Sequence, residues 1–191
     1  MKKIFLLLFI FNFFIFIMFA ILYRSDSKVK SSLGKSNIQN LMKFEAITIN
    51  SEYLNLKKEF ENNKHKVVIN LWATWCKPCL EEITILNSVY DSLSKEDILF
   101  IAIACDESKI SVEQYLNKHQ FKFKQIHYSD ISTSKNIWDD LNNLQESKVQ
   151  IKSLPMTILY DHKSGKHQII NGSFDNYLEC KNEVSSFFNI K

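Results

Sequence analysis

Continuous apolar runs and apolar residues at helical spacing alternate along most of the chain. Residues 67–72 and 98–104 are apolar runs interrupted only by Asn70, and their length is typical of strands that are covered on both faces of a sheet. Between them, residues 80–93 carry apolar side chains every three or four positions, which predicts an amphipathic helix. The three segments together predict a strand, a helix and a second strand of one sheet.

Shorter segments on both sides complete the predicted secondary structure. Residues 44–49 favour a short strand, and Ser51 is placed to cap a helix that carries Tyr53, Leu54, Leu56 and Phe60. Downstream, the pattern favours a helix over 111–119, an extended segment over 121–127, a helix over 134–144, a hairpin of 156–160 and 166–171 that turns at 161–165, and a closing helix over 177–188. This alternation predicts an α/β sandwich around a mainly parallel sheet with an antiparallel edge.

The chain begins with an apolar segment over residues 4–23, whose only strongly polar member is Asn12. A helix of that length is roughly 30 Å long, which matches the hydrocarbon core of a bilayer. A cleaved signal peptide is the alternative, because Lys2 and Lys3 precede the run. The run is longer than the roughly 7–15 residues of a typical signal core, so an uncleaved membrane anchor is favoured.

This reading divides the chain into an anchor over residues 1–23, a polar tether over 24–43 and one domain over 44–191. A domain of this size can build its own core without disulfides. Without Lys2 and Lys3, the chain has 22 basic and 21 acidic residues, so no large basic field remains for nucleic acid.

The chain has only two prolines, and both lie where a thiol–disulfide site needs them. Pro78 is inside the motif CKPC at residues 76–79, and Pro155 follows Cys79 by 76 residues. Two cysteines with this spacing can close a small disulfide ring. The motif therefore predicts redox chemistry.

Cys76 follows a predicted strand and begins a predicted helix. Unpaired backbone N–H groups and the helix dipole favour a thiolate there, and α/β proteins place their sites at this end of the sheet. We expect Cys76 to attack and Cys79, one turn further on, to resolve the mixed disulfide. Lys77 and Pro78 alter the charge and rigidity of the turn, and so tune the reduction potential.

A cysteine pair of this spacing is also half of many zinc sites. Such sites usually need four ligands, and Cys105 and Cys180 are isolated in the sequence. His162 and His167 have a suitable spacing but lie in the predicted hairpin. We therefore expect neither a metal nor another cofactor.

Residues 66–172 resemble the thioredoxin superfamily and, more narrowly, the membrane-tethered TlpA/ResA-like thiol–disulfide oxidoreductases of bacteria. The resemblance rests on VINLWATWCKPC at residues 68–79 and LPMT at residues 154–157. It implies an α/β, thioredoxin-like fold in which helices flank a central mixed β-sheet, preceded by an N-terminal transmembrane helix.

The resemblance also implies that Pro155 is cis and faces the disulfide, where the backbone of Leu154 pairs with an extended client segment. A cis X–Pro bond is uncommon enough to be a built feature, and a trans proline that starts a strand is the alternative. Met156 stands where relatives carry a small or hydroxylated residue. This difference predicts a more apolar docking surface.

Two polar residues flank the cysteine pair in the sequence. Asn70 occupies the place where thioredoxins proper carry a buried acid, and Glu82 matches a glutamate of the ResA-like branch, one helical turn after Cys79. We expect Glu82 to help move the proton of Cys79. A solvated carboxylate on the helix surface is the alternative.

The remaining cysteines and tryptophans divide into core and surface positions. Cys105 and Cys180 are expected to pack in the core as small hydrophobic residues, and a disulfide between them is not indicated by their spacing. Trp72 is expected to be packed as well. Trp75, Lys77 and Pro78 are expected to line the surface that binds the client.

These features predict a membrane-tethered thiol–disulfide oxidoreductase outside the cytoplasm, held in the bacterial cytoplasmic membrane by a single span. The resemblance favours a reductant of client proteins, for example apocytochrome c, which a membrane electron donor recharges. An oxidant that introduces disulfides, a thiol peroxidase of the same fold and a non-catalytic peptide-binding module are the alternatives. A reduction potential separates the first alternative from the favoured function.

Overall fold

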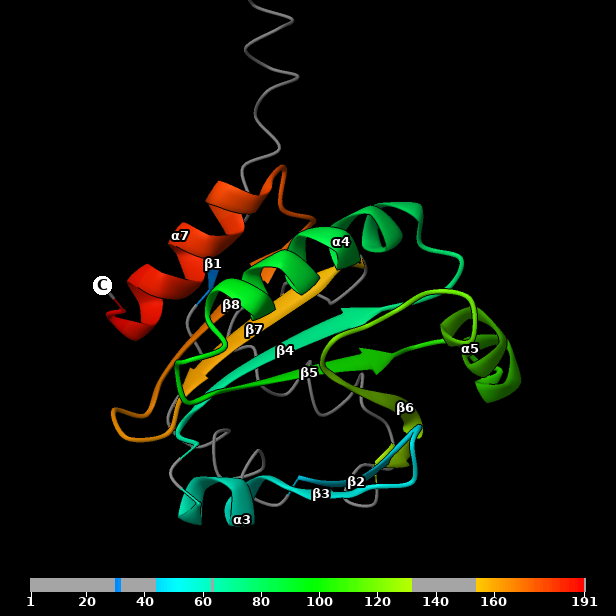
Figure 1. The fold of residues 1–191 in the computed structure, drawn as a ribbon, viewed down its shortest axis with the longest axis horizontal. Coiled ribbons are helices and arrows are strands. Elements are labelled where there is room, and N and C mark those ends of the chain that lie inside the picture. Colours follow the sequence, from blue (N-terminus) through cyan, green and yellow to red (C-terminus); the bar gives the residue numbers. More distant parts are fainter. Residues whose placement is uncertain (1–29, 32–43, 63, 132–153, 191) are drawn as a thin grey trace, which may run out of the picture.

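The computed structural model describes residues 30–31, 44–62, 64–131 and 154–190 (Figure 1). Its strands form one sheet in the order β1-β8-β7-β4-β5-β6-β2-β3. The strands are β1 (Lys30–Ser31), β2 (Glu45–Thr48), β3 (Tyr53–Asn55), β4 (Lys66–Trp72), β5 (Ile98–Ala104), β6 (Lys124–Ile131), β7 (Met156–Asp161) and β8 (Lys166–Asn171). The helices are α3 (Leu56–Glu61), α4 (Lys77–Ser92), α5 (Lys109–Leu116) and α7 (Tyr177–Phe188).

The sheet is mixed, as the resemblance implied, and β4 lies inside it between β5 and β7. Parallel pairing joins β4 to β5 and β5 to β6, whereas every other described pair is antiparallel. The prediction of a mainly parallel sheet with one antiparallel edge is therefore wrong for the described strands. The β7–β8 hairpin extends the sheet on one side and the β2–β3 hairpin extends it on the other, and local periodicity does not encode either attachment.

The apolar core lies on both faces of this sheet. Helices α4 and α7 lie side by side across one face, as Figure 1 shows, while α3 contributes Leu56 and Phe60 to the core of the other face. Val67 packs in one core and Val68 in the other, so consecutive residues of β4 are buried on opposite faces. This double cover explains the nearly continuous apolar runs of the central strands.

Most of the predicted elements are present, but the helix expected after Ser51 begins only at Leu56, and Tyr53 and Leu54 belong to strand β3 instead. Ser51 lies in the turn of a hairpin with a φ of 64°, and its N–H donates to the Thr48 carbonyl at 2.9 Å. Leu54 pairs with Ala46 across the strands β2 and β3. Helix α3 begins only after Asn55, whose side chain caps it by accepting the Lys58 N–H at 3.0 Å.

Other predicted boundaries shift by a few residues. Helix α5 begins at Lys109 with Ser108 as its N-cap, two residues before its predicted start, and β6 begins three residues after the predicted start of the extended segment. The hairpin and the closing helix lie where the sequence predicted them. The helix predicted over 134–144 lies outside the described residues.

The predicted membrane anchor over residues 4–23 also lies outside the described residues. Within the described part of the chain, no helix combines the length and the apolar character that a membrane span needs. Residues 30–31 of the predicted tether form β1, which pairs with β8 at the edge of the sheet.

Candidate active site

The cysteine pair lies where β4 ends and α4 begins. Cys76 is the N-cap of α4, with extended backbone angles, and its Sγ accepts the Cys79 N–H at 3.3 Å. Lys77 and Pro78 are the first residues of the helix. Proline is tolerated at this point because the N–H groups of the first turn have no partner inside the helix. A tight turn leads into the cap, since the Cys76 N–H donates to the Ala73 carbonyl at 3.1 Å.

Cys76 and Cys79 are joined by a disulfide with an S–S distance of 1.97 Å. Both residues are buried in the core beneath α4. When the bond is reduced, the Cys79 N–H and the helix dipole are directed at the Cys76 sulfur, which stabilises a thiolate there. The predicted pairing of these cysteines is confirmed, and the arrangement is suited to thiol–disulfide exchange.

Pro155 lies at the same end of the sheet as the cysteine pair. The Leu154–Pro155 peptide bond is cis, which confirms the conformation that the resemblance implied. Pro155 immediately precedes β7, and in that strand Met156 pairs with Leu71 of β4, the strand that leads into the cysteines. The sheet register therefore brings two sequence motifs together that lie far apart in the chain.

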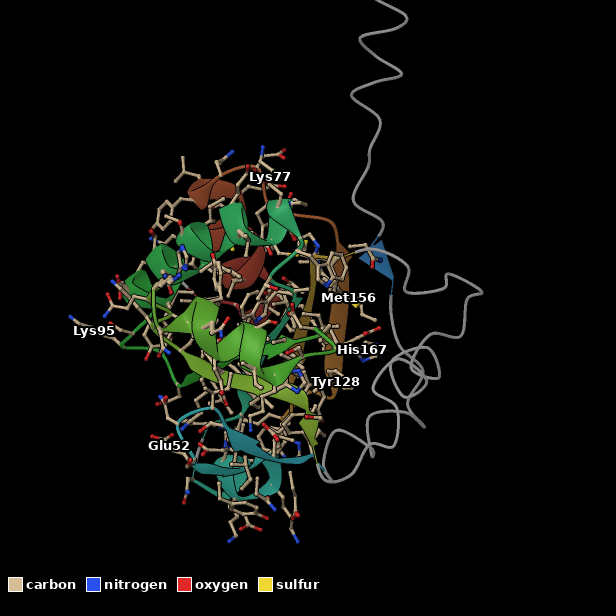
Figure 2. The ribbon with its side chains drawn as sticks, turned by 90° about the vertical axis from the view of Figure 1, so that its right-hand side faces the viewer. Glu52, Lys77, Lys95, Tyr128, Met156 and His167 are labelled. Carbon is tan, nitrogen blue, oxygen red and sulfur yellow. A yellow bond between two sulfur atoms is a disulfide. The ribbon has the colours of Figure 1, made fainter. Side chains whose placement is uncertain are left out.

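The residues predicted to bind the client differ in accessibility. Trp75 is 70 % exposed and the Lys77 side chain extends into solvent at the start of α4 (Figure 2), so both are accessible beside the pair. Leu154 is half-buried. Met156 has no exposed surface, because its side chain packs in the core of the sheet face opposite α4. The prediction that Met156 makes the docking surface more apolar is therefore wrong.

Glu82 is not a solvated surface residue, since it is only 1 % exposed and points from α4 toward the sheet. Its Oε2 accepts a hydrogen bond from the Asn70 amide at 2.9 Å, and its Oε1 accepts the Phe174 N–H at 3.0 Å. The Asn70 amide also donates to the Thr157 hydroxyl at 3.2 Å. A carboxyl group thus lies buried in a hydrogen-bonded network one helical turn from Cys79.

Two members of this network were not predicted from the sequence. Thr157 is paired directly with Asn70 across β4 and β7, so the alternation of the hairpin carries a signal that points to it. The Phe174 N–H is a backbone group in the segment between β8 and α7, 92 residues from Glu82 in the sequence, and no side-chain pattern marks it. Asp106, whose carboxylate accepts the Thr74 N–H, was also missed.

The other two cysteines lie away from the pair. Cys105 and Cys180 are buried, as predicted for core residues, and they pack on opposite faces of the sheet. Burial raises the pKa of Cys105 to about 12, with a further contribution from the charge of Asp106. Trp72 is fully buried against Tyr115 and Phe121, which confirms its predicted packing.

Comparison with known sequences places the chain near bacterial redox proteins. The profile of the AhpC/TSA family matches residues 39–168. Thiol-disulfide oxidoreductase ResA of Bacillus anthracis is 37 % identical over 68 residues, which are 35 % of this chain and 39 % of that protein. ResA of Geobacillus kaustophilus is 29 % identical over 107 residues, 56 % of this chain and 55 % of that protein. The matches thus span about half or less of these curated relatives.

Solved structures share the same architecture at low sequence identity. A thiol:disulfide interchange protein of the thioredoxin family from Chlorobium tepidum superposes with a TM-score of 0.62 and 17 % identity, covering 75 % of this chain and 92 % of that chain. A secreted disulfide oxidoreductase of Mycobacterium tuberculosis gives 0.60 and 18 %, covering 78 % and 98 %. StoA from Bacillus subtilis gives 0.55 and 19 %, covering 74 % and 95 %. These similarities establish a thioredoxin-like α/β fold.

Proposed function

The chain belongs to the AhpC/TSA family, and from this membership we propose that it is a thiol–disulfide oxidoreductase of the ResA type that acts on client proteins. The observation that carries the proposal is the Cys76–Cys79 disulfide at the N-terminus of α4, next to the strand that follows cis-Pro155. The position at the helix start favours a thiolate at Cys76. The buried carboxyl of Glu82 lies one turn beyond Cys79.

The proposed reaction is a two-electron exchange. The Cys76 thiolate attacks one sulfur of a client disulfide, a bond forms between protein and client, and the other client sulfur leaves as a thiolate that takes up a proton. Cys79 then loses its proton and attacks Cys76 Sγ, which releases the second client thiol and forms the Cys76–Cys79 disulfide. The client disulfide is reduced to two thiols and the protein dithiol is oxidised.

Glu82 is proposed to accept the proton of Cys79 in the second step. Its carboxyl group is buried and accepts hydrogen bonds from Asn70 and Phe174, so the network fixes a proton acceptor one helical turn from the resolving thiol. A base that is kept out of water and fixed by neighbours suits proton transfer at a buried sulfur.

The client is proposed to bind across Trp75 and the Leu154–Pro155 segment. Trp75 offers a large exposed aromatic surface beside Cys76, and Leu154 is half-buried at the start of β7. An extended segment that pairs with the backbone of Leu154 would bring its disulfide to Cys76. Lys77 and Pro78 complete the surface around the sulfur.

We further propose that the protein works as a reductant outside the cytoplasmic membrane, tethered there by residues 4–23 and recharged by a membrane electron donor. The apolar length of residues 4–23 and the similarity to ResA proteins support this placement. Apocytochrome c is one client class that fits a reductant of this type. The chain without Lys2 and Lys3 has no large basic field, which argues against nucleic acid as a partner.

A trapping variant tests the activity. In a Cys79→Ala protein the mixed disulfide at Cys76 cannot be resolved, so client adducts accumulate that a strong reductant releases. The matched control is Cys76→Ala, which keeps Cys79 and forms no adduct. Absence of any adduct from exported Cys79→Ala protein contradicts the proposal.

The reduction potential tests the direction. A value near the roughly −270 mV of thioredoxin supports a reductant, whereas a value near the roughly −120 mV of DsbA identifies an oxidant and overturns the proposed direction. Equilibration of the Cys76–Cys79 pair with glutathione or dithiothreitol buffers gives the measurement.

A further inference from the structure

A buried carboxylate ties together the two turns that leave the central strands. Asp106 follows β5 and is 4 % exposed, and its Oδ1 and Oδ2 accept the Thr74 N–H at 3.1 and 3.0 Å. The Thr74 hydroxyl donates a second hydrogen bond to Oδ1. Thr74 lies in the turn between β4 and α4, two residues before Cys76.

Asp106 is itself fixed from two sides. Next to it, the Cys105 N–H donates to the Trp72 carbonyl at 2.8 Å, which continues the pairing of β4 with β5. On the other side, His127 Nε2 donates to the Asp106 carbonyl at 2.8 Å. His127 is buried, and its Nδ1 accepts the Ser129 N–H at 3.3 Å and lies 2.7 Å from the Ser129 hydroxyl oxygen.

We propose that Asp106 acts through Thr74 as a positioning residue for Cys76. This inference rests on the proposed function. The Cys76 N–H donates to the Ala73 carbonyl and closes a turn. Thr74 lies inside this turn, which sets the position of Cys76 as the N-cap of α4. A fixed Thr74 keeps Cys76 Sγ within reach of the Cys79 N–H, the donor that stabilises the thiolate. A loose turn weakens that bond and raises the pKa of the thiol.

A purely electrostatic role of Asp106 predicts the opposite sign. A carboxylate near a thiol disfavours the thiolate, as the charge of Asp106 does at Cys105. If charge alone mattered, neutralising Asp106 would lower the pKa of Cys76, and changing the Thr74 hydroxyl would leave it unaltered. If Asp106 positions the turn, both changes raise the pKa. The direction of the shift therefore separates the two roles.

The test is the pH dependence of alkylation at Cys76 in the full-length reduced protein, with the modified cysteine identified by mass spectrometry. Thr74→Val removes the hydroxyl and keeps the shape, Thr74→Ser keeps the hydroxyl, and Asp106→Asn removes the charge. Lys77 and Glu82 are unchanged in every variant, so their contributions are constant.

We expect Thr74→Val and Asp106→Asn to move the midpoint upward by about one pH unit, which makes alkylation at pH 6 about tenfold slower, and we expect Thr74→Ser to match the wild type. The positioning role is overturned if Thr74→Val shows no shift of the midpoint or Asp106→Asn shows a downward shift. The proposed function stays intact in that case, provided that the wild-type midpoint is well below that of an ordinary thiol. An ordinary wild-type midpoint overturns both. Thr74→Val and Thr74→Ser provide the comparison even if Asp106→Asn fails to fold.

Discussion

The turns after β4 and β5 place a cysteine in two opposite environments at the same end of the sheet. The two strands are parallel neighbours, and Trp72 is paired with Ala104 at their ends. After β4 the chain reaches Cys76 at the N-cap of a long helix, beside an exposed tryptophan. After β5 the next residue is Cys105, which is buried in the opposite core and has no helix start at its sulfur, because α5 begins only at Lys109.

The difference shows that the path of the backbone, rather than the residue type, sets the chemistry of each sulfur. Cys76 receives an N–H donor and the positive end of a helix dipole. The Cys105 thiol donates to the Ile103 carbonyl at 3.6 Å, and burial, with the charge of Asp106, raises its pKa to about 12. Three residues, 73–75, separate the end of β4 from Cys76, whereas Cys105 directly follows the end of β5.

The largest expected effect comes from removing the sulfur at the helix start. Cys76→Ser should lower the reduction of insulin disulfides by more than about 10³-fold, because a hydroxyl at this pH is not a competent nucleophile toward sulfur. The matched control, Cys105→Ala, should retain the activity. An equal loss of activity in Cys105→Ala would contradict the claim that only the turn after β4 carries a reactive cysteine.

Alkylation of the reduced protein should show the difference between Cys76 and Cys105 directly. At pH 7.5 a thiol with a pKa of about 12 has a thiolate fraction on the order of 10⁻⁴ to 10⁻⁵, so Cys105 should react with iodoacetamide at least about 10³-fold more slowly than Cys76. Mass spectrometry of timed samples gives both rates. Comparable rates at the two positions would show that the turn after β5 opens readily in solution.

A smaller effect is expected at the carboxyl group near the pair. Glu82→Gln keeps the size of the side chain but removes the proton acceptor, so client reduction at pH 7 should fall by about 10- to 100-fold and the pH–rate profile should change shape. Thr157→Val, which alters the network without removing the carboxyl, is the matched control and should keep the wild-type profile. An unchanged profile in Glu82→Gln removes the proposed role.

The smallest expected effect concerns stability at alkaline pH. The folded protein holds Cys105 protonated up to a pKa of about 12, whereas the unfolded chain releases that proton near 9. The unfolded state therefore binds fewer protons above pH 9, and the free energy of unfolding falls as the pH rises, by about 1 kcal/mol at pH 10. Urea unfolding of wild type and Cys105→Ala isolates this contribution, since the variant lacks it. Equal pH slopes for the two proteins would contradict the deep burial of this thiol.

The parts of the fold that were predictable are those whose patterns are local. The buried strands, helix α4 and the β7–β8 hairpin follow from apolar runs, helical spacing and a turn with glycine. Strand β3 was missed because three residues are too short for a clear period, and its partner β2 supplies the reason for its extension. The sequence did not predict that most strand pairs are antiparallel, because one such pair joins β2 to β6, which lies far along the chain.

The site divides in the same way. The cysteine pair and Pro155 were predicted from spacing and resemblance, because their chemistry depends on residue type. The burial of Met156 and Glu82 was not predictable, because it depends on which neighbours approach from distant segments. The hydrogen bonds from Thr74 to Asp106 join residues 32 positions apart in the sequence, and only the register of the parallel strands β4 and β5 brings these two residues together.

The place of β4 between β5 and β7 has a consequence for biosynthesis. A ribosome delivers Cys76 and Cys79 well before it delivers Thr157 and Phe174, which complete the network around Glu82. In an oxidising compartment, the nascent chain therefore presents both thiols while the insertion of β7 is still pending, and foreign disulfides compete with the native pair during that interval. The network around Glu82 can be complete only once the chain has been synthesised as far as Phe174.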